Sequence, residues 1–206
     1  MDQLIDLTQI IEEDMPNYPG DIRTNLFQNK YLSVNEHNNY RLDISMHTGT
    51  HIDSPMHLLE TSEYISEASL DSFIAKGCVL DVRNQPIIKM KMEYEKLVRE
   101  NSIVLLYTAF DKLYGLPKYY EDHPVIDLGF AEFLLQKNIK MIGMDMPSPD
   151  QYPFAIHKLF LKNKIYIIEN LTNLDKVLDN KNFEIIAFPL KIKADSSMAR
   201  VVARVF

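Results

Sequence analysis

Short apolar segments recur along the chain at lengths that are typical of β-strands. Five of these segments are predicted to be strands, and they span residues 78–82, 102–108, 140–146, 165–169 and 184–190. The closing segment ARVVARVF alternates in part between apolar and polar positions, so it is predicted to be a further strand.

Helical spacing of apolar residues appears in four segments that lie around and between these strands. They are 69–76, 90–99, 129–137 and 155–162. In the second of them, Tyr94, Leu97 and Val98 fall on one face of a helix. Strands that are interleaved with helices predict an α/β domain, and the N-terminal third is richer in strands than in helices.

One segment of the N-terminal third alternates strictly. Leu42, Ile44 and Met46 are apolar and the residues between them are polar, which predicts a half-buried strand over 41–47. His47 continues the polar side of this strand.

Composition and charge narrow the class of protein. The chain has 206 residues, 46% of them apolar and 25% charged, which suits one globular domain spanning 1–206. The net charge is −7 and no block of Lys and Arg appears, so a nucleic-acid-binding protein is not expected. The longest apolar run, 103–110, is too short to cross a bilayer, and the acidic N-terminus does not resemble a signal peptide. We therefore expect a cytoplasmic domain that makes no membrane contact.

Candidate chemistry is concentrated in the segment HTGTHIDSPMH, residues 47–57, which holds three of the six histidines and one aspartate. Gly49 and Pro55 disfavour a helix, so the histidines are expected where a strand end runs into a loop. On a straight strand the titratable residues of this segment would be spread over about 33 Å. We therefore expect the chain to bend at Gly49 and at Pro55, so that these side chains converge.

Metal binding is the physical reason to gather imidazoles and a carboxylate in so short a segment. Neutral imidazole nitrogens and carboxylate oxygens suit zinc, manganese or iron. Two histidines and one aspartate also leave a coordination position for water, as a catalytic site requires. The alternative is a solvated polar loop with coincidental histidines, and the spacing favours the metal site.

The pattern His-x-Gly-Thr-His-x-Asp-x-Pro-x-His resembles the signature of the cyclase family of metal-dependent hydrolases, which includes the bacterial kynurenine formamidases and isatin hydrolases. Further segments resemble the family in the same order along nearly the whole chain: MPNYPGD, LLYTAF, IGMDMPSPD, IHKLFLKNKIYIIENLTNLD and FPLKIKADSSMARVVA. The resemblance implies a single α/β domain with a mixed, barrel-like sheet, the swivelling β/β/α fold. It also implies assembly into homodimers or homotetramers.

The resemblance further implies which residues would bind metal. His47 and His51 would serve one ion together with Asp53, and His157 would serve a second. The carboxylates of Asp53 and Glu169 would be shared between the two ions. Taken alone, Glu169 could be a strand-end charge in solvent and His157 a surface histidine, and the resemblance favours ligands in both cases.

The implied activity is hydrolysis of an amide carbon–nitrogen bond, with an aryl formamide of the N-formylkynurenine type as substrate. Zinc is the expected metal, with manganese as the alternative, at one or two ions per chain, and it would lower the pKa of a bound water to about 7. His57 would be the acid/base group that passes a proton to the leaving nitrogen. Tyr18 and Phe110 lie where the family carries tryptophan, so both are expected to contact the substrate, although Phe110 could equally pack in the core.

Two alternatives stay open. A ring-opening hydrolase of lactams or lactones, including isatin-type substrates, would use the same metal site. A non-catalytic metal-dependent binding protein is the alternative of another class, and the presence of His57 beyond the ligand set argues against it. In each case the expected partner is a small molecule.

Other reactive residues give weaker signals. Cys78 is the single cysteine of the chain, so an intrachain disulfide cannot form. It is expected to fill an apolar position rather than act as a reactive thiol. His37 and His123 have no motif support and are interpreted as surface or structural residues. Asp145 and Asp150 could orient metal ligands or fix a turn, and the supporting role is favoured for Asp145.

Overall fold

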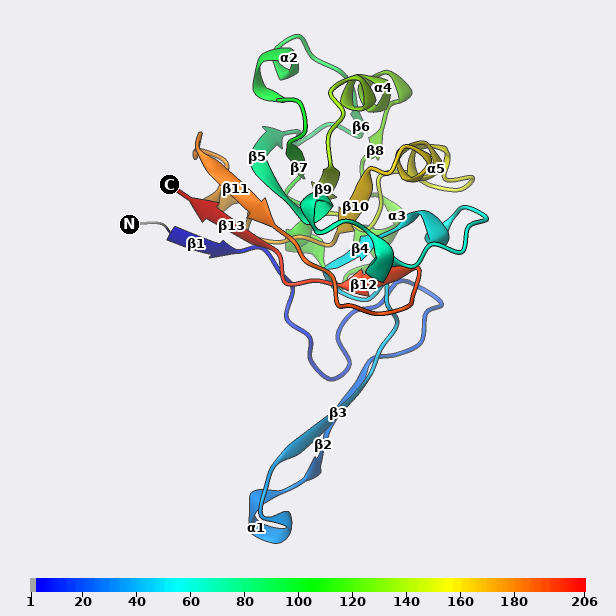
Figure 1. Cartoon of the computed structure of the whole chain (residues 1–206), viewed down its shortest axis with the longest axis vertical. Helices are drawn as coiled ribbons and strands as arrows, with labels where there is room; N and C mark the ends of the chain where they lie inside the picture. The colour runs from blue at the N-terminus through cyan, green and yellow to red at the C-terminus, as the bar shows by residue number, and fades with distance from the viewer. Residues whose placement is uncertain (1–2) are drawn as a thin grey trace.

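The computed structural model describes residues 3–206, and its centre is a nine-stranded mixed sheet that curls into an open half barrel (Figure 1). The strand order is β1-β13-β11-β5-β7-β9-β10-β4-β12. The bounds of these strands are β1 Gln3–Asp6, β4 His51–Asp53, β5 Ile74–Asp81, β7 Ile103–Tyr107, β9 Met141–Met144, β10 Tyr166–Glu169, β11 Phe183–Ile186, β12 Ser196–Met198 and β13 Val202–Val205.

Two small sheets and short helices complete the fold. One small sheet joins β2 (Asn25–Lys30) to β3 (Asn39–Asp43), and the other joins β6 (Ile87–Ile88) to β8 (Val125–Ile126). The α-helices are α1 Leu32–Asn35, α2 Tyr94–Leu97, α3 Pro117–Glu121, α4 Leu128–Gln136 and α5 Ala155–Lys162. The 3-10 helices are η1 Pro55–His57, η2 Ile65–Glu67, η3 Leu70–Phe73, η4 Phe110–Leu113 and η5 Leu174–Lys176.

The predicted fold class is confirmed. Every one of the five predicted strand ranges overlaps a strand of the large sheet, and the closing segment contains β13. Strands β5, β7, β9 and β10 run parallel, whereas the strands at both ends of the sheet pair antiparallel. The sheet is therefore mixed and barrel-like, as predicted, and it forms the centre of an α/β domain.

Two of the four predicted helices are confirmed by α4 and α5. The segment 90–99 contains only the short α2. The helix predicted over 69–76 is wrong, because η3 ends at Phe73 and β5 begins at the next residue. The start of β5 pairs antiparallel with β11, which places Ala75 opposite Ile185, and these sheet hydrogen bonds override the local helical pattern.

Two interpretations around the histidine motif also need correction. The strand β3 spans Asn39–Asp43, so it ends before His47, and all of its residues are exposed rather than half-buried. It lies in a hairpin that stands away from the body, where the chain covers neither of its faces (Figure 1). His51 and Asp53 lie on the buried strand β4 and not in a loop that follows a strand.

The core lies on both faces of the large sheet, because successive side chains of a strand point to opposite sides. Val104 and Leu106 pack toward helices α4 and α5, whereas Ile103 and Leu105 pack into the curl of the sheet. Cys78 packs against the first of these clusters, and burial raises the pKa of its thiol to about 11, as expected for an unreactive apolar position.

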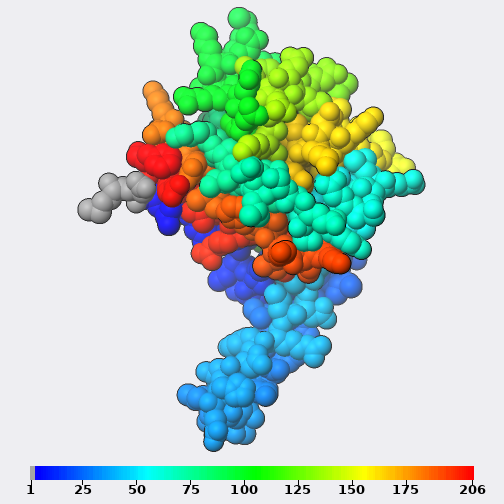
Figure 2. Space-filling view, viewed as in Figure 1, coloured from blue at the N-terminus to red at the C-terminus, as the bar shows by residue number. Residues whose placement is uncertain are grey.

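The hairpin of residues 25–43, here called the arm, contains β2, α1 and β3 and projects from the body as a separate stalk (Figure 2). Within residues 3–206, no helix has both the length and the apolar character needed to cross a membrane.

Candidate metal and active site

Three of the candidate ligands share one face of the sheet. Strand β4 lies between β10 and β12, and its register places His51 opposite Glu169 and Asp53 opposite Ile167. Residues two apart in a strand point the same way, so His51, Asp53 and Glu169 project from the same face. All three side chains are buried.

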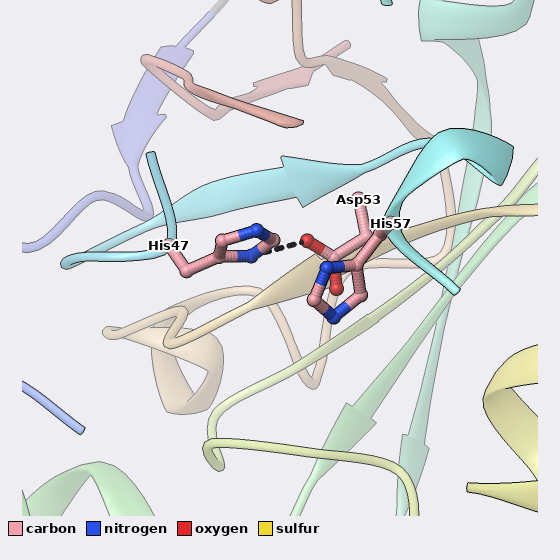
Figure 3. Close-up of side chains that lie close together, drawn as sticks. All are labelled: His47, Asp53 and His57. Carbon is pink, nitrogen blue, oxygen red and sulfur yellow. Dashed lines mark ion pairs between the residues drawn. The ribbon is translucent and has the colours of Figure 1, made fainter. Parts of the chain in front are cut away.

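Two bends bring the ends of the histidine motif back to this face. Gly49 has φ of +66°, a left-handed conformation that suits glycine, and a Cβ there would lie 2.9 Å from Met15 Cε. Pro55 begins the 3-10 helix η1, which turns His57 toward His47, with ring centroids 4.1 Å apart. Figure 3 shows both rings close to Asp53, one from the loop before β4 and one from the turn after it. The bends expected at Gly49 and Pro55 are present.

The fourth imidazole comes from a distant part of the chain. His157 lies in the first turn of α5, which follows the loop after β9. Its Nε2 lies 3.2 Å from Glu169 Oε1 and 3.9 Å from Asp53 Oδ2. The fold therefore brings together the five residues predicted to be ligands.

Hydrogen bonds on the side away from the carboxylates set the orientation of the His51 and His157 rings. His51 Nδ1 lies 2.9 Å from the Gly49 carbonyl oxygen, which can only accept, so Nδ1 carries the proton. His157 Nδ1 lies 2.5 Å from Asp150 Oδ1, so this nitrogen also donates. In both rings the Nε2 atom is directed toward the carboxylates of Asp53 and Glu169. A histidine ligand held in this way presents its other nitrogen to a metal.

Asp195 links the two remaining rings. Its Oδ2 lies 2.9 Å from His47 Nε2 and 3.4 Å from His57 Nδ1. The inner nitrogen of His47, Nδ1, lies 2.9 Å from Asp53 Oδ1. His57 is more exposed than the buried rings, and it lines the cavity described below.

Three buried polar atoms at the centre have no hydrogen-bond partner among residues 3–206. They are His51 Nε2 and both carboxylate oxygens of Asp53. Leaving such atoms unpaired in the interior costs about 1–3 kcal/mol each, and more for charged groups. A divalent cation would bind all three, and the nitrogen and oxygen donor set suits zinc or manganese. The residues present therefore fit a metal.

The distances identify two overlapping sets of ligand atoms. Within the described chain, one set of His47, Asp53 and His57 and another of His51, Asp53 and Glu169 each offer ligand atoms within 4.8 Å of one another. Asp53 belongs to both sets. The presence of His57 in the first set means that its role as an acid/base group must be separated by experiment from a role as a ligand.

The buried groups of the cluster shift one another's pKa values. Burial by itself would lower the pKa of His157, but hydrogen bonds with Asp150 and Glu169 outweigh burial and raise that pKa to about 10. Burial likewise opposes the shift of His51, yet the charge of Asp53 raises the pKa of His51 well above its ordinary value. The pKa of Asp53 is held well below its usual range because His51 and His47 outweigh the effect of burial.

A cavity of about 240 Å³ opens over this cluster. Four residues of the cluster line it, His47, His57, His157 and Glu169, together with the polar residues Asp21, Thr48, Ser148 and Asn170. The rest of the wall is mainly aromatic and apolar: Pro16, Tyr18, Leu58, Tyr114, Tyr120, Pro147 and Phe154. The arrangement can hold a flat apolar molecule with one polar group directed at the cluster.

The two residues predicted to contact substrate are placed differently. Tyr18 lines the cavity and packs edge to face against Tyr120, with ring centroids 5.7 Å apart. Phe110 is not among the residues that line it. Its ring packs against the core cluster instead, because it begins η4 directly after the turn at Ala109. The structure therefore brings Tyr18, and not Phe110, to the site.

The residues outside the motif match their interpretations in part. His37 is exposed in the arm, and His123 is buried, with Nδ1 donating to the Tyr120 carbonyl oxygen at 3.0 Å. Among the described residues, Asp145 forms no hydrogen bond with a candidate metal-ligating residue. Its carboxylate accepts hydrogen bonds from the backbone N–H groups of Thr108 and Ala109 and from the Thr108 hydroxyl.

Two carboxylates outside the motif contact the site histidines. Asp150, one of the two aspartates that could orient a ligand, contacts His157, whereas the sequence favours Asp145 for this supporting role. Asp195 contacts His47 and His57 and was not singled out at all. The only available signal was its place in the closing segment that resembles the cyclase family.

Comparisons with known proteins show which sequences and structures this chain is similar to. The family model described as Cyclase matches residues 5–151. A kynurenine formamidase from Bacillus mycoides is 31% identical over 209 residues, covering 98% of this chain and 97% of its own. The solved structure of isatin hydrolase A from Ralstonia solanacearum is similar with a TM-score of 0.86 at 21% identity, covering 100% of this chain and 92% of that one. A "predicted metal-dependent hydrolase" from Bacillus stearothermophilus is similar with a TM-score of 0.77 at 25% identity, covering 99% and 98%.

Proposed function

Because the chain belongs to the cyclase family, we propose that it is a metal-dependent hydrolase that cleaves the carbon–nitrogen bond of an aryl formamide or a related aromatic amide. One observation carries this proposal. Three imidazoles turn an inner nitrogen toward two buried carboxylates while an acceptor holds each outer nitrogen. The similarity to kynurenine formamidases supports an amide as the substrate.

We assign the metal ligands as follows. His47 Nδ1 and His51 Nε2 would hold one ion together with Asp53 Oδ1, which lies 2.9 Å and 3.4 Å from these nitrogens. His157 Nε2 and Glu169 would hold a second ion together with Asp53 Oδ2. Zinc is the proposed ion and manganese the alternative, because the ligands are nitrogen and oxygen without thiolate.

Each residue around the cluster then has a defined task. A divalent ion bound there supplies Lewis-acid activation of water and of the scissile carbonyl. His57 delivers a proton to the leaving nitrogen, and Asp195 orients the His57 ring through Nδ1, so that Nε2 is available to the substrate. Tyr18 and Tyr120 hold the aromatic part of the substrate and exclude water from the cavity.

The function is tested with a panel of aryl formamides, lactams and lactones and with protein loaded with zinc or manganese. Aryl formamides are expected to be hydrolysed fastest, with release of formate and the free aryl amine. Faster opening of a lactam or lactone ring would assign the alternative activity to the same site. A fully loaded protein that hydrolyses no member of the panel would refute the proposal and favour a binding protein.

The hydrogen bond of Asp150 to His157 gives a first prediction. In Asp150→Asn the side-chain oxygen can keep its bond with the Ile156 N–H group, which lies 2.6 Å from Asp150 Oδ2. The amide nitrogen then faces His157 Nδ1 and donates to it, which moves the ring proton to Nε2. The affinity for metal is expected to fall about 10–100-fold, the usual effect of losing such an outer partner.

The matched control is Asp145→Asn, a buried aspartate of the same loop that contacts the Thr108 turn and no ligand. It is expected to lower the melting temperature while leaving metal affinity unchanged. Both affinities can be measured by competition with a chromophoric chelator. Equal affinities in Asp150→Asn and the unmodified protein would contradict the assigned role of Asp150.

The raised histidine pKa values give a second prediction. Without an ion, His157 holds a proton on Nε2 at neutral pH, because its pKa is raised to about 10, and the pKa of His51 is shifted in the same direction by the charge of Asp53. A metal must displace these protons, so its affinity falls as the pH falls, about tenfold per pH unit for each displaced proton. The affinity is therefore expected to fall continuously as the pH falls below about 10, the pKa of His157, and hydrolysis is expected to fall with it.

Calorimetry in buffers of different ionisation enthalpy checks this proton release directly. Metal binding that releases no protons near neutral pH, or full activity at about pH 5, would rule out this ligand set.

Assembly and compartment are further parts of the proposal. We propose that the enzyme is a homodimer or homotetramer and that it works in the cytoplasm, as the sequence predicts.

A further inference from the structure

Asn170 directly follows Glu169, at the point where β10 ends. It is buried and belongs to the wall of the cavity. Its φ is +57°, in the left-handed region that asparagine enters more readily than most residues. The turn after β10 therefore holds a polar side chain in the interior, where its polar atoms need partners.

All four polar atoms of Asn170 have hydrogen-bond partners on other segments. The backbone N–H group donates to the Met146 carbonyl oxygen at 3.2 Å, and the backbone carbonyl oxygen accepts from the Thr50 hydroxyl at 2.6 Å. In the side chain, Oδ1 accepts from the Tyr119 hydroxyl at 2.7 Å, and Nδ2 donates to the Gly49 carbonyl oxygen at 2.9 Å. These bonds join the end of β10 to α3 and to the loop before β4.

The Gly49 carbonyl oxygen is the point where this network reaches the metal site. It accepts two hydrogen bonds, one from Asn170 Nδ2 and one from His51 Nδ1, each at 2.9 Å. A carbonyl oxygen has two lone pairs, so both are used. The bond from His51 keeps the proton on Nδ1 and leaves Nε2 for a metal. The position of this oxygen therefore determines how His51 faces the proposed ion.

Gly49 by itself does not hold its carbonyl group in place. Glycine lacks a Cβ atom and adopts both signs of φ, so the peptide between residues 49 and 50 can rotate at little steric cost. Two bonds with Asn170 oppose this rotation: the Gly49 oxygen accepts from its side chain, and the Thr50 hydroxyl donates to its backbone carbonyl oxygen. Because the bonds hold both residues of one peptide, its rotation would break at least one of them.

Tyr119 sets the direction in which the Asn170 amide faces. Its buried hydroxyl donates to Oδ1, so the amide nitrogen faces Gly49, whose carbonyl oxygen can only accept. The Tyr119 ring packs edge to face against Tyr114 and Tyr120, with centroids 5.3 Å and 5.1 Å apart, and both of these residues line the cavity. One continuous set of contacts therefore joins the aromatic wall of the cavity to the metal site.

We propose that Asn170 is a positioning residue for the metal site. It holds the peptide between residues 49 and 50 in place, and the Gly49 carbonyl oxygen then orients His51 as a ligand. Tyr119 in turn keeps the Asn170 amide in the orientation that this role requires. The inference rests on the assignment of His51 as a ligand in the proposed function, and it does not depend on the identity of the substrate.

The first test measures zinc affinity by competition with a chromophoric chelator. Asn170→Gly removes both side-chain bonds and suits the left-handed backbone. Its affinity is expected to fall about tenfold, the lower end of the usual effect of losing an outer partner. Asn173→Gly is the matched control, because Asn173 has φ of +60° and its Nδ2 donates to the Asp6 carbonyl oxygen, outside the cavity. It is expected to keep the affinity of the unmodified protein.

Tyr119→Phe tests the second part of the proposal, because it removes only the hydroxyl that orients the amide. Its zinc affinity is expected to fall, by less than in Asn170→Gly. Tyr114→Phe is the control, since the Tyr114 hydroxyl donates to the Pro16 carbonyl oxygen at 3.1 Å and not to a residue of this network. Zinc affinity is expected to be unchanged in Tyr114→Phe.

Cobalt(II) distinguishes a positioning role from a merely stabilising one. At saturation its visible absorption spectrum reports the geometry of the ligands around the ion. The spectrum is expected to shift in Asn170→Gly and to stay unchanged in Asn173→Gly. A lower melting temperature with an unchanged spectrum would overturn the proposal, because Asn170 would then only stabilise the fold.

The comparison with His51→Ala separates the possible failures. Unchanged zinc affinity in Asn170→Gly, together with metal loss in His51→Ala, would overturn the role of Asn170 and leave the ligand assignment intact. Retained metal in His51→Ala would overturn the ligand assignment and this inference with it. Neither measurement uses a substrate, so a failure of the aryl formamide panel bears on the proposed activity alone.

Discussion

Asp53→Ala is expected to remove bound metal from the protein and to abolish hydrolysis. The two oxygens of Asp53 face both halves of the cluster: Oδ1 lies 2.9 Å from His47 Nδ1, and Oδ2 lies 3.9 Å from His157 Nε2. Both oxygens are buried without a hydrogen-bond partner among residues 3–206. Alanine at this position therefore removes a ligand from each proposed ion.

Elemental analysis measures the bound metal, and thermal unfolding measures how much the metal stabilises the folded protein. An ion that binds only the folded state, present at about 1,000 times its dissociation constant, stabilises that state by about 4 kcal/mol. Chelation should lower the melting temperature of the unmodified protein and leave that of Asp53→Ala unchanged. The difference between the two proteins isolates metal binding from any general effect of the substitution.

A retained metal in Asp53→Ala would show that the ion lies elsewhere. Asp21→Ala is the matched control, because Asp21 is an exposed aspartate at the wall of the same cavity and is not among the assigned ligands. It should keep both metal content and the response to chelation.

His57→Ala is expected to lower the turnover rate about 10²–10⁴-fold, the usual contribution of a positioned acid/base group. Metal content and melting temperature should stay near those of the unmodified protein. The reason is the position of the ring: His57 lines the cavity and is oriented through Nδ1 by Asp195, whereas His51 is fully enclosed by the cluster. Loss of the ring therefore removes a proton carrier and leaves the buried ligands in place.

His51→Ala is the comparison variant that separates loss of a metal ligand from loss of a proton carrier. It removes a buried ligand, so metal and activity should be lost together. Metal stoichiometry, melting temperature and turnover are measured on the same preparation of each variant. If His57→Ala is inactive because it has lost its metal, His57 is a ligand of the set that it forms with His47 and Asp53. An active His57→Ala enzyme would assign the proton transfer to another group.

The sequence by itself determined the elements whose pattern is local. The apolar runs predicted five strands of the large sheet, and the helical spacing predicted α4 and α5, because side-chain periodicity reflects which face of an element is buried. The bends of residues 47–57 also have a local cause, since Gly49 and Pro55 impose the turns that bring His47 and His57 together. In these cases the physical cause lies within a few residues of its effect.

Only the tertiary structure decided the features whose causes are distant in the chain. Sheet pairing with β11 turned the start of β5 into strand against a helical pattern, and the pairing of β4 with β10 placed Glu169 beside His51. Asp150 and Asp195 became partners of the site histidines through loops whose course no local pattern specifies. The alternation of 41–47 predicted burial, yet Leu42 is exposed and Ile44 and Met46 are only partly buried in the single chain. A periodic pattern determines which side of a strand needs cover, whereas the folded chain and its partners determine what covers it.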